Sequence, residues 1–182
     1  MPHRAALRGG ASHLGVATVA EARELREAGI NSPILVLGSS DPSEAPIAAG
    51  LEVAIGIGDQ VQAERLLLAL ENAPPAHPLV VHLKIDTGMR RFGVGISEAP
   101  ALGRLLNSHP RVHLDGLYSH FAESDVACTD RMDEQLETFL RTRRVLSEIG
   151  IQPEIAHISN SAALLRNRSA DLNMVRAGIC LY

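Results

Sequence analysis

Short apolar runs rich in β-branched residues recur along the chain, and each predicts a buried strand. They lie at Leu14–Thr18, Ile34–Gly38, Val53–Ile57, Leu79–Asp86, Leu114–His120, Glu154–Asn160 and Met174–Tyr182. The segments between them have helical spacing, so strands and helices alternate. This alternation predicts a parallel sheet whose strands are joined by right-handed helical crossovers.

Capping residues and apolar spacing mark three of the helices. Thr18 and Glu21 have the spacing of a capping box, which predicts a helix that Gly29 closes. Asp59 is expected to cap a second helix, which carries Val61, Leu66, Leu67 and Leu70. A long helix ending at Gly150 is expected to have one apolar face, formed by Leu136, Phe139, Leu140, Leu146 and Ile149.

The number of strands chooses between the two common parallel architectures. About seven strands, with no glycine-rich dinucleotide loop after the first, favour a (β/α)8 TIM-type barrel over a doubly wound sheet. The segment from Arg4 to Gly10 resembles the end of a helix and leads directly into Leu14. We therefore predict one α/β domain over residues 1–182, an incomplete barrel that lacks its first βα unit.

The predicted strand Leu79–Asp86 has a polar face. Alternation puts His82, Lys84 and Asp86 on one side and apolar residues on the other. Polar groups inside a parallel sheet are costly unless they pair or line a site. The carboxyl-terminal mouth of a barrel is where such a site is expected.

Composition and charge exclude several classes of protein. Lys and Arg number 17 against 21 Asp and Glu, a formal net charge of -4, so no basic surface for nucleic acid is expected. No apolar run approaches the ~18 residues of a membrane span, and the polar N-terminus is unlike a secretory signal. Cys128 and Cys180 lack zinc-ligand spacing. We predict a cytoplasmic protein with reduced thiols and without a metal site.

Four segments at the ends of predicted strands carry the chemically useful side chains. They are HLKIDTGMRRFG at 82–93, GLYSHFA at 116–122, HISNSAA at 157–163 and VRAGICLY at 175–182. Together they resemble the barrel domain of the alanine racemases, fold-type III enzymes that use pyridoxal 5'-phosphate (PLP), and the resemblance runs along the full chain. It implies an isomerase that interconverts L- and D-alanine for cell-wall peptidoglycan and works as a homodimer. Serine racemases share much of this pattern, so serine stays open as a substrate.

The resemblance assigns a phosphate site to the last two segments. Ser161 resembles the hydroxyl that binds the cofactor phosphate, and the amides around Gly178 and Ile179 resemble its backbone donors. A hydroxyl and free N–H groups suit a dianion. Asn160 lies beside them and is expected to help fix the turn. The alternative for Ser161 is a plain helix N-cap.

Two further residues are assigned to the cofactor ring. Arg176 resembles the arginine that faces the pyridine nitrogen, and arginine has only donors, so it cannot protonate that nitrogen. His120 resembles the histidine beside this arginine, although a lone histidine at the end of a strand is more often structural. His82, His113 and His157 are interpreted as structural.

Arg91 and Lys84 complete the assigned site. Arg91 resembles the arginine near the phenolic oxygen of the cofactor and the substrate carboxylate, with glycines on both sides that allow a close approach. Lys84 resembles a lysine that is carbamylated in many members of the family, and its anionic form would pair with Arg91. The alternative is an ordinary contact of Lys84 with Asp86 or with the backbone.

The two proton-transfer groups of the family have no match in this sequence. The Schiff-base lysine belongs to a first-strand segment that is not found here, and Lys84 is the only lysine. The second base is a tyrosine that the C-terminal domain of the partner subunit supplies. Racemisation needs a base on each face of the substrate, so we predict that the 182-residue chain alone racemises little. A non-catalytic PLP-binding barrel protein and an incomplete gene product are the two alternatives.

Overall fold

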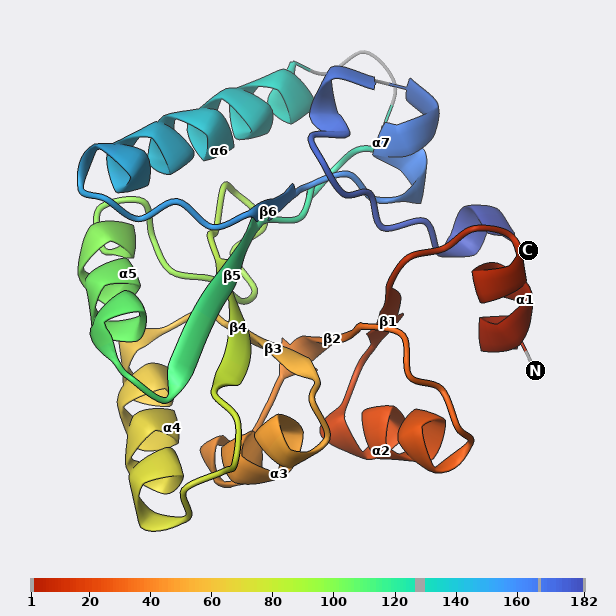
Figure 1. The fold of residues 1–182 in the computed structure, drawn as a ribbon. Coiled ribbons are helices and arrows are strands. Elements are labelled where there is room, and N and C mark those ends of the chain that lie inside the picture. The colour runs from red at the N-terminus through yellow and green to blue at the C-terminus, as the bar shows by residue number, and fades with distance from the viewer. Residues whose placement is uncertain (1, 127–129, 167, 182) are drawn as a thin grey trace.

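Six parallel strands form one curled sheet in the computed structural model, which describes residues 2–126, 130–166 and 168–181 (Figure 1). Each strand pairs with the next along the chain, so the order in the sheet is the order in the sequence. The strands are β1 Leu14–Val16, β2 Ile34–Ser39, β3 Ala54–Ile57, β4 Leu79–Lys84, β5 Val112–Tyr118 and β6 Ile155–His157. The predicted incomplete TIM-type barrel is confirmed, with six strands in the described residues where seven were expected.

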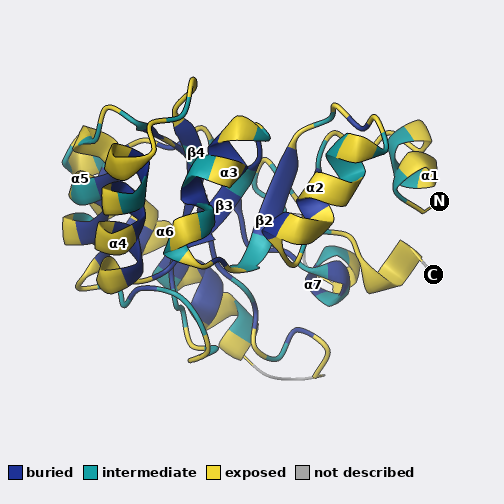
Figure 2. Cartoon of the chain, turned by 90° about the horizontal axis from the view of Figure 1, so that it is seen from below, coloured by how far each residue is buried: buried dark blue, intermediate teal, exposed yellow. Residues whose placement is uncertain are grey.

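Helices cover the outer face of the curled sheet, as Figure 1 shows for α2 to α6. The helices are α1 Pro2–Arg8, α2 Val19–Glu27, α3 Ala45–Gly50, α4 Gln60–Asn72, α5 Ala99–Ser108, α6 Arg131–Glu148 and α7 Ser161–Arg166. Short 3₁₀ turns occupy Pro42–Glu44, Arg168–Ala170 and Ile179–Leu181. Both ends of the chain lie on one side of the molecule, away from α4 and α5 (Figures 1 and 2).

The predicted helix caps are confirmed. The Thr18 hydroxyl accepts from the Glu21 amide at 3.2 Å, and the Glu21 carboxylate accepts from the Ala17 amide at 2.7 Å. Asp59 caps α4 by accepting from the Gln62 amide at 2.7 Å. Because such contacts lie within four residues, the local sequence is enough to predict them.

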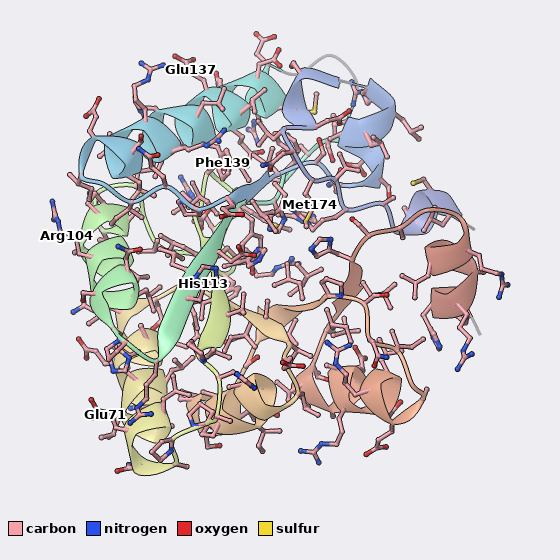
Figure 3. The ribbon with its side chains drawn as sticks, viewed as in Figure 1. Glu71, Arg104, His113, Glu137, Phe139 and Met174 are labelled. Carbon is pink, nitrogen blue, oxygen red and sulfur yellow. The ribbon has the colours of Figure 1, made fainter. Side chains whose placement is uncertain are left out.

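The apolar core lies between the strands and the inner faces of the helices (Figure 2). Phe139 of α6 is fully buried, on the side of its helix that faces the sheet (Figure 3). The assignment of two residues to apolar helix faces is wrong, because Val61 is 57% exposed and Leu140 is 38% exposed. Each lies one position away from a core-facing residue, and one residue turns a helix by about 100°.

The predicted strand Met174–Tyr182 is not formed in the part of it that the structure describes, residues 174–181. This segment runs beside β6 but makes one ladder-like hydrogen bond, from the Arg176 amide to the Ser159 carbonyl at 3.0 Å. Before it, the Asn173 side chain takes the place of a strand backbone, since it accepts from the Ala156 amide and donates to the Glu154 carbonyl. A single backbone bond is too few to define a strand.

Two other sequence expectations concern the surface. In the described residues, none of the helices is both long and apolar enough to cross a bilayer. Cys180 is exposed, and Cys128 lies outside the described residues.

Candidate active site at the carboxyl ends of the strands

Three neighbouring strands end at the same level and bring three side chains together. Lys84 ends β4, Tyr118 ends β5 and His157 ends β6, and these residues are in register across the sheet. The Tyr118 and His157 rings stack at 4.9 Å between centroids and 5° between planes. His120 and Asn160 follow in the loops and Ser161 begins α7, so the carboxyl edge of the sheet gathers most of the predicted site.

Arg176 connects the ends of β5 and β6. Its Nη1 lies 2.7 Å from Nδ1 of His157. Its Nη2 donates to the carbonyls of Ser119 at 2.7 Å and Ile158 at 3.1 Å, and lies 3.3 Å from Nδ1 of His120. None of these contacts uses the Nε–H, so this donor has no hydrogen-bond partner among the described residues.

The electrostatics of this cluster keep the arginine charged and the histidines neutral. Burial lowers the pKa of Arg176 to about 10. Burial, together with the charges of Arg176, Lys84 and Arg91, lowers the pKa of His120 to about 4. Burial and Arg176 also hold the pKa of His157 well below its usual range. At neutral pH both imidazoles therefore serve Arg176 as uncharged neighbours.

Asn160, not Ser161, caps helix α7. The Asn160 side-chain oxygen accepts from the Ala163 amide at 3.0 Å and from the Ser124 hydroxyl at 2.8 Å. Its side-chain nitrogen is thereby turned toward Nε2 of His120, 3.5 Å away. The alternative interpretation of Ser161 as the N-cap is wrong, because the first helical residue cannot also be the cap.

Ser161 instead faces the segment that follows Arg176. Its hydroxyl accepts from the Gly178 amide at 2.9 Å and from the Cys180 amide at 3.4 Å. The Ile179 amide, which was predicted to act with that of Gly178, makes no hydrogen bond with this hydroxyl. The structure thus joins a buried hydroxyl and two backbone donors from segments that are 17 and 19 residues apart.

Lys84 lies among aromatic rings and cations. It is 6% exposed, and its Nζ is 4.7 Å from the centroid of Phe92 and 5.4 Å from that of Tyr118. Burial, then the charges of Arg91 and Arg176, lower its pKa to about 8, and Asp86 opposes this shift.

The loop after β4 uses Asp86 for its own structure. Oδ1 of Asp86 accepts from the Gly88 amide at 2.8 Å and the Arg90 amide at 3.1 Å, and among the described residues no hydrogen bond joins this carboxylate to Lys84. Gly93, with φ of +136°, has no room for a side chain, since a Cβ would lie 2.8 Å from the Asp86 nitrogen.

Arg91 remains apart from the other assigned residues. Its side chain is exposed and has no hydrogen-bond partner among the described residues. It acts on Lys84 and His120 through its charge alone. The structure therefore brings Arg176, His120 and Asn160 into contact and Lys84 within electrostatic range, and it leaves Arg91 on the loop.

Sequence reasoning missed the buried rings beneath this cluster. His82 and His157 were interpreted as structural, and Tyr118 was not singled out, yet His157 contacts Arg176 directly. Their position inside the motif segments, with Tyr118 and His157 at strand ends and His82 two residues before one, is the signal that could have found them. His113 differs from them, because its side chain is 61% exposed on β5 (Figure 3).

The sequence matches the family described as "Alanine racemase, N-terminal domain" over residues 3–182. The chain belongs to this family. It is 42% identical over 180 residues to an alanine racemase of Geobacillus stearothermophilus, a match that covers 98% of this chain and 45% of the relative. The chain thus spans less than half the length of the curated relatives it matches.

Solved structures agree with the family. An alanine racemase from Bacillus anthracis with bound L-Ala-P superposes with a TM-score of 0.92 at 36% identity, covering 99% of this chain and 46% of that one. A histidine racemase from Leuconostoc mesenteroides has a TM-score of 0.88 at 25% identity and covers 100% of this chain and 49% of that one. The same barrel scaffold therefore occurs in racemases named for different amino acids.

Proposed function

We propose that residues 1–182 form the PLP-binding barrel domain of an alanine racemase, an isomerase that interconverts L- and D-alanine in the cytoplasm as a homodimer. The observation that carries this proposal is the junction of β5, β6 and the 176–180 segment. There, the Arg176 guanidinium, whose Nε–H has no partner among the described residues, precedes the backbone amide of Gly178, which contacts the Ser161 hydroxyl. Family membership supports the proposal independently.

The donor set at this junction fits a phosphorylated pyridine ring. The Ser161 hydroxyl and the amides of Gly178 and Ile179 would supply donors for a phosphate dianion, and the Gly178 amide, which donates to Ser161 in the structure, would turn to a phosphate oxygen instead. Arg176 offers its Nε–H to a ring nitrogen that can only accept. When bound, PLP supplies an electron sink that makes the α-hydrogen of an amino acid removable.

The protein residues have three separate tasks in this proposal. Arg176 binds the ring nitrogen without giving up a proton, because its pKa of about 10 keeps it charged. His120, neutral at its pKa of about 4, is held beside Arg176 as an uncharged neighbour. Arg91, on a loop with glycines on both sides, is the cation placed to meet a substrate carboxylate.

We assign proton transfer to no residue of this chain. Lys84 is the only lysine, and it lies against Phe92 and Tyr118 beside two arginines. We therefore expect the purified 182-residue chain to bind PLP but to racemise alanine at a negligible rate. Robust racemisation of L-alanine by this chain, followed by circular dichroism, would contradict the proposal.

The Ser161→Ala variant is expected to weaken PLP binding about tenfold or more, because a charge-assisted hydrogen bond to phosphate is lost. The dissociation constant is measured by equilibrium dialysis against PLP, with pyridoxal, which lacks the phosphate, as a second ligand. Ser161→Ala should leave pyridoxal binding unchanged. The exposed Ser108→Ala on α5 is the control and should bind both ligands like the original chain. Equal PLP affinity in Ser161→Ala would remove the phosphate assignment.

We expect Lys84 to be carbamylated. CO₂ adds only to the neutral amine, forming an N–C bond and releasing a proton. At a pKa of about 8, roughly half of Lys84 is neutral at pH 8, against about one in three hundred for an ordinary lysine. The carbamate is an anion, so it would attract Arg91, whereas the lysine cation is repelled by Arg91.

A single lysine makes this expectation easy to test. In ¹³C-bicarbonate buffer, the chain should show one protected carbamate carbon by NMR, and Lys84→Arg should lose that signal. Carbamate confined to the α-amino group in both proteins would show that Lys84 stays unmodified.

A further inference from the structure

A line of buried polar contacts runs from Asp115 on β5 to Arg176. Nε2 of His82 lies 3.7 Å from the Asp115 carboxylate. Nδ1 of His82 lies 2.8 Å from Nε2 of His157, and Nδ1 of His157 lies 2.7 Å from Nη1 of Arg176. The two histidines are 2% and 0% exposed, so water does not compete for the contact between their rings.

Only one arrangement of protons is compatible with every contact in this line. Arginine can only donate, so Nδ1 of His157 must be an acceptor. His157 is neutral, and its proton is therefore on Nε2, where it donates to Nδ1 of His82. His82 must then carry its proton on Nε2, which faces the Asp115 carboxylate. The opposite tautomer of His82 would place two N–H groups against each other.

The His82 ring is closely packed by its neighbours. A Cβ at Gly116 would lie 2.2 Å from Nδ1 of His82, so only glycine leaves space for this ring. Tyr118 lies edge-on to His82, with 6.4 Å between ring centroids, and stacks on His157. These neighbours surround the ring where its Nδ1 meets Nε2 of His157.

Two other titratable groups face this line. His113 Nε2 lies 3.5 Å from the second oxygen of Asp115 and is largely exposed. His13, before β1, is close enough to His82 and Asp115 for both to affect its pKa. Contact with His82 is the main cause of the lowered pKa of Asp115, which is consistent with an Nε2–H directed at a carboxylate.

We propose that Asp115 and His82 are positioning residues that stabilise the tautomer of His157 which Arg176 requires, and thereby hold the Arg176 guanidinium in place with its Nε–H unpartnered. The carboxylate favours the Nε2–H form of His82, which leaves Nδ1 free to accept from His157. Arg176 then keeps an acceptor on its buried side. This inference rests on the proposed function, because it gives Arg176 the cofactor ring as its ligand.

The first test reads the tautomers without PLP. In a ¹⁵N-histidine-labelled chain at about pH 8, where imidazoles are neutral, long-range ¹H–¹⁵N NMR should show both His82 and His157 as Nε2–H forms. Variants that remove one histidine at a time assign the signals. Asp115→Asn removes the charge from a half-buried position, and it should produce a measurable fraction of the other tautomer at His82 and His157. An Nδ1–H form at either ring in the original chain, or unchanged tautomers in Asp115→Asn, would overturn the proposal.

A rescue pair separates positioning from simple packing. His82→Asn keeps an acceptor near the place of Nδ1, and this amide oxygen does not depend on a tautomer. His82→Leu fills similar space without an acceptor. His157 should keep its Nε2–H form in His82→Asn, and adding Asp115→Asn should then change nothing. His82→Leu should lose that form, and equal spectra for the two variants would contradict the inference.

PLP affinity supplies the second measurement. His82→Leu should weaken PLP binding about threefold to tenfold, the effect of one misplaced hydrogen-bond donor, whereas His82→Asn should weaken it less. If the tautomers behave as expected but the chain does not bind PLP, the proposed function fails and the positioning of Arg176 stands. If PLP binds and the tautomers are wrong, the inference alone fails.

Discussion

Replacing Arg176 with methionine is expected to lower the free energy of unfolding by about 2–4 kcal/mol. Methionine fills much of the same space but cannot donate. The carbonyls of Ser119 and Ile158 and Nδ1 of His157 would then lose the donor they share. Each buried acceptor left alone costs about 1–3 kcal/mol, and removing a desolvated cation offsets part of this.

Urea unfolding of the chain, followed by far-UV circular dichroism, measures this change. Arg143→Met, on the exposed side of α6, is the matched control and should change stability by less than about 0.5 kcal/mol. The same variant tests the electrostatics, because the pKa of His120 should rise once the charge of Arg176 is gone. Stability equal to that of the control would show that Arg176 does not hold the ends of β5 and β6 together.

The Gly116→Ala variant is expected to cost about 3 kcal/mol, the upper end of the range for overpacking a core. In a strand, alanine is normally no worse than glycine, so the loss must come from the collision with His82. The backbone of β5 cannot move away easily, because β4 and β6 pair with it on both sides. The His82–His157 contact should therefore break.

The control for this variant is Gly50→Ala at the end of α3. A Cβ there meets nothing within 4 Å, so the change should be neutral or slightly stabilising. Unfolding midpoints compare the two variants, and the histidine NMR spectrum reports whether the contact breaks. A Gly116→Ala protein as stable as Gly50→Ala, with unchanged histidine signals, would show that the ring of His82 is loosely held.

Much of the secondary structure could be predicted because its causes are local. Thr18 and Asp59 cap helices through residues three positions away, and the alternation that buries Leu83 is visible in a few letters. The motif segments also predicted where the site lies, since parallel strands bring their carboxyl ends to one edge. Six of the predicted strands are present for these reasons.

The errors occurred where the answer depends on distant partners. A strand at residues 174–181 needs a neighbour to complete its ladder, and in the described residues it makes one such backbone bond, to the Ser159 carbonyl just after β6. Leu140 looks like a core residue until the position of the sheet shows which side of α6 is covered. Asn160 and Ser161 are equally good caps by sequence, and only the approach of Gly178 separates their tasks.

By itself, the sequence determined the strands, the helix caps, the family and the edge of the sheet at which the polar residues gather. Tertiary structure alone decided which of those residues touch: His82 meets His157 across 75 positions, and Arg176 meets His120 across 56. Periodicity and capping are set by neighbours within a turn or two, so they can be read along the chain. Which nitrogen of a buried histidine ring carries the proton depends on the groups that the tertiary structure brings into contact with it, and the local sequence does not show which groups these are.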